Sequence, residues 1–341
     1  RLGVQAASPT IVLTLDAGTL QITSATGNAL ANNRRVQVNA AGGSIADFGS
    51  NNFYEPAIVN NAGPGSSFYL SNISGTTQFR GAISGTGSVT WIGTSASNIA
   101  SFQGANTYTG DTVVKLGTLK LEFTGTNTGT TRLSSSTAVK LNGGTLSIQG
   151  TATAGQTTSQ TINGLTVSGN CSVVNTSGGT TPNFLSSSIA LGNITRSNLG
   201  TVNFTLPAIG NITSTRANVG GIIGGWATVG GTDWAATTSD GITASNITAL
   251  SSYLTTTVAG DTAANYLSTS NVDVTSTQNL SGPVTINSLR FNSAAANTLN
   301  LTGTNIVTAG GVLATTNVGA NASAVNGGIL TVADAGQTSI A

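Results

Sequence analysis

A short glycine-led run of alternating apolar residues returns five times along this chain, and this recurrence constrains the fold more than any other feature of the sequence. The copies begin at Gly18, Gly117, Gly144, Gly311 and Gly328 and read GTLQI, GTLKLEF, GTLSI, GVL and GILTV. In the clearest copies the interval is about twenty to thirty residues, which suits one turn of a solenoid built from short strands. We therefore expect an all-β chain in which each turn stacks on the one before it.

The strand pattern continues between these copies. Leu119, Leu121 and Phe123, for example, alternate with Lys120 and Glu122. Alternation over a few residues, bounded by Gly, Asn, Ser or Thr, is typical of a half-buried strand that ends in a turn. Only 6% of the 341 residues are charged, so amphipathic helices with charged solvent faces are not expected. Stacked strands explain the low charge, because like charges repel when equivalent positions lie about 4.8 Å apart.

Asn-Gly dipeptides join several of the runs and leave an alternative open. They occur, for example, at Asn142-Gly143 and Asn163-Gly164. Between two strands this pair favours an antiparallel hairpin, as in a β-sandwich or barrel. Asn and Gly also suit the left-handed bends of solenoid corners, because both tolerate positive φ. The glycine-led recurrence favours one parallel β-helix over residues 1–341, with roughly fourteen to seventeen turns and a length of about 65 to 80 Å.

The repeat weakens between residues 216 and 266. Two of the three tryptophans, Trp226 and Trp234, fall in this stretch. We interpret it as an irregular excursion from the coil, with a short helix from Ile247 to Tyr253. Two forms of the excursion remain open: an irregular turn whose aromatic rings fill a wider core, or a loop that protrudes from the solenoid.

One segment resembles a known family. The run FQGANTYTGDTVVKLGTLKLEF, residues 102–123, resembles the autotransporter-associated β-strand repeat, because its NTYTG and GTL elements stand at that family's relative spacing. Residues 138–150, 219–235 and 286–303 look like the segments that flank such repeats in large bacterial surface proteins. The positions that define the repeat in this chain are Asn106, Tyr108, Gly110, Gly117, Leu119, Gly144, Leu146 and Gly328.

The resemblance implies a right-handed parallel β-helix that is exported from a Gram-negative-type cell, with a passenger or surface-layer role. Autotransporters end in a membrane barrel with a terminal aromatic residue, whereas this chain has no aromatic residue after Phe291. Membrane insertion is therefore not expected of this segment. A membrane-spanning helix is not expected either, because the most apolar stretch, residues 219–229, is short and broken by glycines.

Acidic residues are the main candidates for chemistry, and they are few. Parallel β-helix enzymes that cleave acidic polysaccharides use acidic residues from adjacent turns, but this chain has ten acidic residues and no histidine. Asp233 with Asp240 is the best pair and Asp261 with Asp273 the next, although neither spacing places both carboxylates on one face. We expect no enzyme, no catalytic residue, no cofactor and no metal. An isolated Asp in a glycine-rich turn usually caps the bend. Calcium binding at Asp233 or Asp240 remains an open alternative, although the chain lacks the nonapeptide repeat of calcium-binding solenoids.

The eleven basic residues are scattered, so nucleic acid is not an expected partner. Strand-like patterns at both ends of the chain would let another chain continue the ladder. The expected function is a non-catalytic extracellular structural protein: a subunit or segment of a bacterial cell-surface fibre that assembles head to tail as a homopolymer. The alternative is an adhesin passenger module in which Trp226, Asp233, Trp234 and Asp240 bind a surface glycan or a protein. A polysaccharide-degrading β-helix enzyme is the third interpretation.

Overall fold

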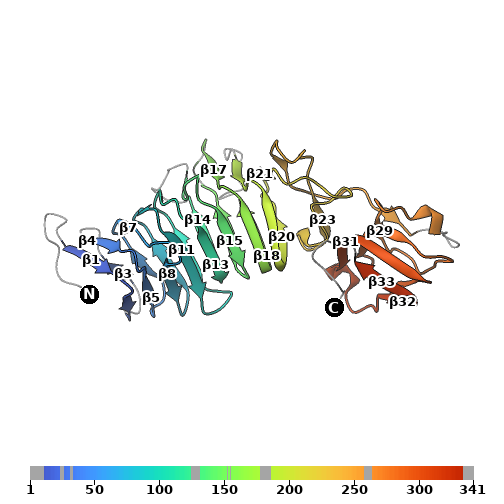
Figure 1. Cartoon of the computed structure of the whole chain (residues 1–341), viewed down its shortest axis with the longest axis horizontal. Helices are drawn as coiled ribbons and strands as arrows, with labels where there is room; N and C mark the ends of the chain where they lie inside the picture. Colours follow the sequence, from blue (N-terminus) through green and yellow to red (C-terminus); the bar gives the residue numbers. More distant parts are fainter. Residues whose placement is uncertain are drawn as a thin grey trace. The chain divides into compact units, whose positions relative to one another are not determined.

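The computed structural model describes residues 11–23, 27–30, 34–123, 131–151, 153, 155–176, 186–256 and 263–332. Within these ranges the protein is all-β, and parallel strands stack as a β-solenoid of about 12 turns (Figure 1). The helical elements in the same ranges are two short 3₁₀ turns, η1 (Ala263–Asn265) and η2 (Thr316–Val318). The predicted fold class is thus confirmed, and the antiparallel sandwich is wrong.

The chain divides into two compact units, residues 1–201 with 205–215 and residues 202–204 with 216–341, which we describe separately. A single solenoid over residues 1–341 therefore stays a prediction. The described strands of the first unit are β1 (Ile11–Leu15), β2 (Thr19–Ile22), β3 (Gly27–Leu30), β4 (Arg34–Val38), β5 (Gly43–Asp47), β6 (Asn52–Tyr54), β7 (Ile58–Asn60), β8 (Ser67–Asn72), β9 (Thr76–Phe79), β10 (Ile83–Gly85), β11 (Ser88–Gly93), β12 (Ile99–Phe102), β13 (Thr112–Leu116), β14 (Thr118–Glu122), β15 (Val139–Asn142), β16 (Thr145–Gln149), β17 (Thr157–Thr161), β18 (Leu165–Thr176), β19 (Ser186–Ala190), β20 (Ile194–Thr205) and β21 (Gly210–Ser214). Of these, β20 ends beyond residue 201.

These strands form parallel columns that run from turn to turn. One column is β1-β4-β7-β10, a second is β2-β5-β8-β11-β13-β15-β18, and a third is β3-β6-β9-β12-β14-β16-β18. The long strand β18 serves two columns, because Leu165 pairs with Val139 of β15 and Ser172 pairs with Thr145 of β16. β13, β15 and β18 lie side by side in Figure 1, as this pairing requires.

The turns are fewer than predicted, partly because those between β13 and β19 are longer than 25 residues. Thr118 pairs with Thr145, and Thr145 pairs with Ser172, which is 27 positions further along the chain each time. The extra residues form the bends between columns. A second reason is that the coil becomes irregular in part of the chain after residue 216, as described below.

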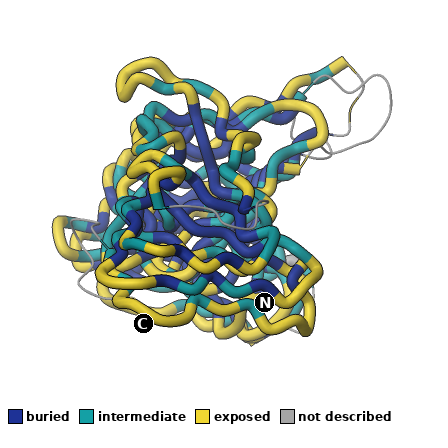
Figure 2. The backbone as a smooth tube through the Cα atoms, turned by 90° about the vertical axis from the view of Figure 1, so that its right-hand side faces the viewer, coloured by how far each residue is buried: buried dark blue, intermediate teal, exposed yellow. Residues whose placement is uncertain are grey.

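The interior of the first unit consists of ladders of like side chains. Ala100, Leu119, Leu146 and Val173 occupy equivalent positions on four successive turns, and each is 0% exposed. Figure 2 shows that buried residues gather in the interior of the backbone trace, while exposed residues gather at its outer bends. Burial of an aliphatic side chain contributes about 1.5–3 kcal/mol, so these ladders hold the turns together.

The family-like segment supplies the bend between β12 and β13. Asn106 is buried, and it accepts a hydrogen bond from the Ile83 N–H at 2.7 Å and donates one to the Arg132 carbonyl at 2.8 Å, so that it joins three turns. Tyr108 is 0% exposed, with its hydroxyl 2.5 Å from Oγ1 of Thr112. An Asn and a Tyr at these positions therefore fix the bend from inside.

The glycines that define the repeat lie where neighbouring turns approach closely. A Cβ on Gly110 would lie 2.4 Å from the backbone carbon of Gly87 on the preceding turn. Gly117 and Gly328 have positive φ, 79° and 58°. A Cβ on Gly144 would lie 2.5 Å from a methyl of Val114. Only glycine fits these positions without a shift of the backbone or of a packed side chain.

The second unit is a shorter solenoid with its own core. A five-stranded parallel sheet runs β26-β27-β29-β31-β33, and a three-stranded one runs β28-β30-β32. Between them lies a buried cluster that includes Val272, Leu289, Leu299 and Val307. The strands of this unit are β22 (Ala227–Val229), β23 (Asp233–Ala236), β24 (Ser245–Asn246), β25 (Thr248–Ala249), β26 (Leu254–Thr255), β27 (Asn271–Asp273), β28 (Gln278–Asn279), β29 (Thr285–Phe291), β30 (Thr298–Asn300), β31 (Thr304–Ala314), β32 (Ala324–Asn326) and β33 (Ile329–Val332).

In residues 219–253, which we call the cover segment, the parallel coil becomes irregular, although β22 still pairs in parallel with residues 202–204 of β20. Here β22 pairs with β23 and β23 with β25, both in antiparallel orientation. Ile222 and Trp234 form a second buried cluster with Ala309 of β31, and Leu250 packs against it. The cover segment therefore folds back onto the five-stranded sheet, on the face opposite the main core.

The short helix predicted from Ile247 to Tyr253 is wrong. This stretch contains β25, and its other residues have no regular secondary structure. The Leu250 N–H donates to the carbonyl of Trp234 at 2.8 Å, and the Tyr253 hydroxyl accepts from the Trp234 N–H at 3.0 Å. Contacts with β23 thus replace the intrahelical hydrogen bonds that the local sequence would have made.

Candidate functional site

The two tryptophans proposed as ligand-binding residues lie in the interior. Trp226 is 5% exposed and Trp234 is 2% exposed. The guanidinium of Arg216 lies 5.9 Å from the centre of the Trp226 ring, and Trp234 packs with Ile222 and Ala309. Neither indole offers an open face to a sugar. The burial of both rings favours the interpretation in which aromatic rings fill the interior over that of a protruding loop.

The structure gives Asp233 and Asp240 separate roles. Asp240 lies in an exposed turn, where its Oδ1 accepts hydrogen bonds from the N–H groups of Thr243 at 2.6 Å and Ile242 at 2.9 Å. These two hydrogen bonds hold the pKa of Asp240 below its ordinary value. Asp233 instead contacts Arg290. Asp240 is therefore a turn cap, as the sequence analysis considered for an isolated Asp.

Asp261 of the second candidate pair lies outside the described residues. Its partner Asp273 instead shares Arg290 with Asp233.

Asp233, Tyr253, Asp273 and Arg290 form what we call the charge cluster. Nη1 of Arg290 donates to Oδ1 of Asp233 and to the Thr232 carbonyl, and Nη2 donates to Oδ2 of Asp273 at 2.7 Å. The guanidinium carbon lies 3.6 Å from the centre of the Tyr253 ring, within range of a cation–π contact. The side chains of Arg290 and Asp273 are each 8% exposed and that of Asp233 is 27% exposed. The cluster therefore ties the cover segment to β27 and β29.

Burial and charge shift the pKa values in this cluster in defined directions. Burial lowers the pKa of Arg290, but the hydrogen bond to Asp273 and the neighbouring negative charges outweigh it, and the pKa is raised overall. Burial raises the pKa of Tyr253 to about 12, against the opposing effects of the Trp234 N–H and Arg290. Both groups keep their ordinary protonation states at neutral pH, so Arg290 is charged and Tyr253 is neutral.

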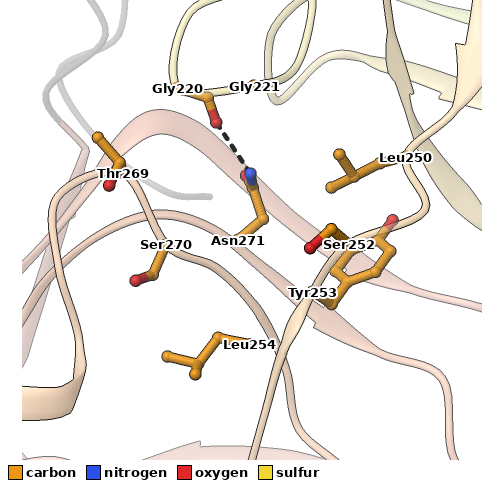
Figure 3. A pocket seen from close by; sticks show the side chains of 9 residues that line it. All are labelled: Gly220, Gly221, Leu250, Ser252, Tyr253, Leu254, Thr269, Ser270 and Asn271. Atoms are coloured by element: carbon orange, nitrogen blue, oxygen red, sulfur yellow. Dashed lines mark hydrogen bonds between the residues drawn. The ribbon is translucent and has the colours of Figure 1, made fainter.

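A cleft lies beside the charge cluster, at the seam between the cover segment and the solenoid of the second unit (Figure 3). It is widely open to solvent and has a volume of about 620 Å³. We call it the seam cleft. Its lining residues are Gly220, Gly221, Leu250, Ser252, Tyr253, Leu254, Thr269, Ser270 and Asn271.

Asn271 and Asn287 fix one side of the seam cleft. Val219 and Ile222 bridge across a turn in which Gly220 and Gly221 have φ of 59° and 90°. The Nδ2 groups of Asn271 and Asn287 donate to the Gly220 carbonyl at 2.9 and 3.0 Å. A Cβ on Gly220 would lie 2.3 Å from the Asn287 amide. The turn can therefore approach the sheet this closely only because residue 220 is glycine.

Three residues of this region, Arg290, Tyr253 and Asn271, were not among the site residues predicted from the sequence. A signal for Arg290 was present: it lies inside a strand, TINSLRF, in which six of seven residues are buried. A cation between apolar neighbours in such a run indicates a buried partner of opposite charge. No comparable signal marks Tyr253 or Asn271, because their roles depend on the path of the cover segment.

Comparisons with protein-family models, with curated proteins and with solved structures found no match. Among the described residues, no helix is long and apolar enough to cross a membrane. The same part of the chain holds no group of three or more His, Cys, Asp or Glu side chains that could bind a metal ion.

Proposed function

We propose that this chain is a non-catalytic structural β-solenoid, a subunit or segment of a bacterial cell-surface fibre. The observation that carries the proposal is that buried polar side chains form hydrogen bonds from one turn of the solenoid to the next. Asn106 links three turns. Oε1 of Gln160 accepts hydrogen bonds from the backbone N–H groups of Arg132 and Leu133, which lie on the preceding turn. Nε2 of the same side chain donates to the Leu133 carbonyl.

The acidic residues support the same proposal. Among the described residues, Asp233 and Asp273 hold Arg290, and Asp240 caps a turn. Glu122 contacts Lys120 at 3.0 Å and Asp111 contacts Lys140 at 2.5 Å, each on the outside of the solenoid. A catalytic pair would need carboxylates that face a substrate. These carboxylates are instead engaged within the protein.

The extracellular location rests on the resemblance of residues 102–123 to a repeat of exported surface proteins and on a composition poor in charge. Assembly into a fibre is supported by the geometry of the stack. Parallel strands pair with the turn before and the turn after in the same way, so pairing between two chains would require no new backbone arrangement. Such head-to-tail contacts are heterologous and do not close into a ring.

Electron microscopy of the purified chain at micromolar concentration tests the proposal. We expect unbranched filaments, whose diffraction shows a reflection at about 4.8 Å along the fibre axis, from the strand spacing. Protease treatment of intact producing cells is the second test, because a surface protein is degraded while a cytoplasmic control is not. Monomers at all concentrations, or protection from protease in intact cells, would contradict the proposal.

A further inference from the structure

We propose that the seam cleft binds a neutral saccharide. This inference goes beyond the structural role proposed above and does not depend on it, since a solenoid can carry a binding site whether or not it forms fibres. The argument rests on three features of the cleft: the absence of charge from its lining, the exposed hydroxyl-bearing residues Ser252 and Thr269, and the aromatic ring held in place at its side.

The lining selects for a neutral ligand. All nine residues that line the cleft are uncharged, and the nearby charges of Asp233, Asp273 and Arg290 neutralise one another in part within the charge cluster. An anionic or cationic ligand would lose hydration on entering without gaining an ion pair. A neutral ligand does not meet this cost.

Side chains with hydroxyl groups line both sides of the cleft. Ser252 belongs to the cover segment and Thr269 to the loop before β27, and both residues are exposed. Figure 3 shows Ser252 and Leu250 on one side of the cleft and Thr269 and Ser270 on the other. Each hydroxyl can both donate and accept, which matches the hydroxyl groups of a sugar.

Tyr253 and two leucines supply an apolar surface. The guanidinium of Arg290 holds Tyr253 at 3.6 Å from its ring centre, and the Trp234 N–H holds its hydroxyl at 3.0 Å. The ring is therefore fixed in place before any ligand arrives, which lowers the entropy lost on binding. Leu250 and Leu254 extend this surface. Sugars combine hydroxyl edges with apolar C–H faces, and an aromatic ring beside polar side chains suits both.

The test is saturation-transfer NMR of the full chain with glucose, galactose, mannose, N-acetylglucosamine, lactose, cellobiose and chitobiose, each at up to about 10 mM. Glucuronic acid and glucosamine serve as charged probes. We expect binding of at least one neutral saccharide. The double variant Ser252→Ala/Thr269→Ala should weaken that binding about tenfold or more, since each lost hydroxyl removes a hydrogen bond.

A blocking variant and its control locate the site. Thr269→Trp fills the rim of the cleft from an exposed position and should abolish binding, while Ala320→Trp, at an exposed position of the same unit that does not line the cleft, should leave binding unchanged. Circular dichroism confirms that both variants fold. Three results would overturn the inference: no saccharide bound, charged sugars preferred, or full binding retained by folded Thr269→Trp. Filament formation by electron microscopy reads out the structural proposal separately.

Discussion

Removal of Arg290 should detach the cover segment from the solenoid of the second unit. In Arg290→Met the side chain keeps its approximate length but loses its charge, so Asp273 stays buried with an 8% exposed side chain and no cation. Breaking a buried ion pair from one side costs about 3–5 kcal/mol. Asp233, with its side chain 27% exposed, can regain water, so its loss adds about 1 kcal/mol at most. Most of the expected loss is therefore the 3–5 kcal/mol of the buried pair with Asp273, and the total is about 3–6 kcal/mol.

Native-state proteolysis with chymotrypsin measures this loss where it occurs. The cover segment contains Trp234, Leu250 and Tyr253, which chymotrypsin cleaves only when the segment opens, because Trp234 is 2% exposed and packs in a cluster with the other two. When opening and closing are faster than cleavage, the cleavage rate follows the open population. A loss of about 3–6 kcal/mol should therefore raise the rate by about a hundredfold or more.

The double variant Arg290→Met/Asp273→Leu is the control. Replacing both members of a buried ion pair with apolar residues is often neutral or stabilising, so most of the lost protection should return. Asp233→Asn should raise the cleavage rate only a few fold, because this carboxylate is the more exposed one. The reasoning would be refuted if Arg290→Met cleaved no faster than the wild type, or if the double variant cleaved as fast as the single one.

Three further predictions concern the ladders, the glycines and Tyr253. Leu146→Ala should destabilise the first unit by about 2–5 kcal/mol in urea denaturation, whereas Ser147→Ala, on the other face of β16, should change stability by less than about 0.5 kcal/mol. Gly110→Ala should lower the free energy of unfolding by about 1–3 kcal/mol or more, because its Cβ would meet the backbone of Gly87. Gly18→Ala, with no atom within 4 Å of the new methyl, should be nearly neutral. Equal effects of the two substitutions would contradict the packing argument. The folded-state pKa of Tyr253 lies above its unfolded value of about 10, so its contribution to stability is constant below pH 10 and lost as pH rises through about 12. The difference between the ultraviolet titrations of the wild type and Tyr253→Phe at 295 nm isolates Tyr253 from the other four tyrosines. This difference should show a step near pH 12, and a difference step near pH 10 would contradict the burial.

The solenoid was predictable because its information is local and repeated. Each alternation such as TLKLE specifies a strand with one buried face, and the close-packed glycines specify the bends. Recurrence then supplies the long-range pairing, since equivalent residues of successive turns must stack. The number of turns was less predictable, because the bends vary in length without changing the strands.

The cover segment was not predictable in the same way, because no repeat relates it to the sheet it covers. Asn271 meets Gly220 across 51 positions of sequence, and Arg290 meets Asp233 across 57. The predicted helix at Ile247–Tyr253 failed for this reason: β23 offered its backbone as a partner, and tertiary contacts outweighed local propensity. Trp226 and Trp234 were noticed because they fall where the repeat weakens. The sequence does not say, however, whether an aromatic residue faces a core or a ligand.

The position of the cover segment explains why a solenoid strand carries a buried cation at all. An outer face of a solenoid normally meets water, and a strand such as β29 would then carry Ser, Thr or Asn at its outward positions. Once residues 219–253 cover that face, Asn271, Asn287 and Arg290 can fix the segment through directional bonds that apolar contacts do not provide. Such bonds specify one arrangement of the segment, and with it the shape of the seam cleft. The stability of the charge cluster and the capacity of the cleft to bind a ligand are therefore expected to be coupled: a variant that releases Arg290 should lose both.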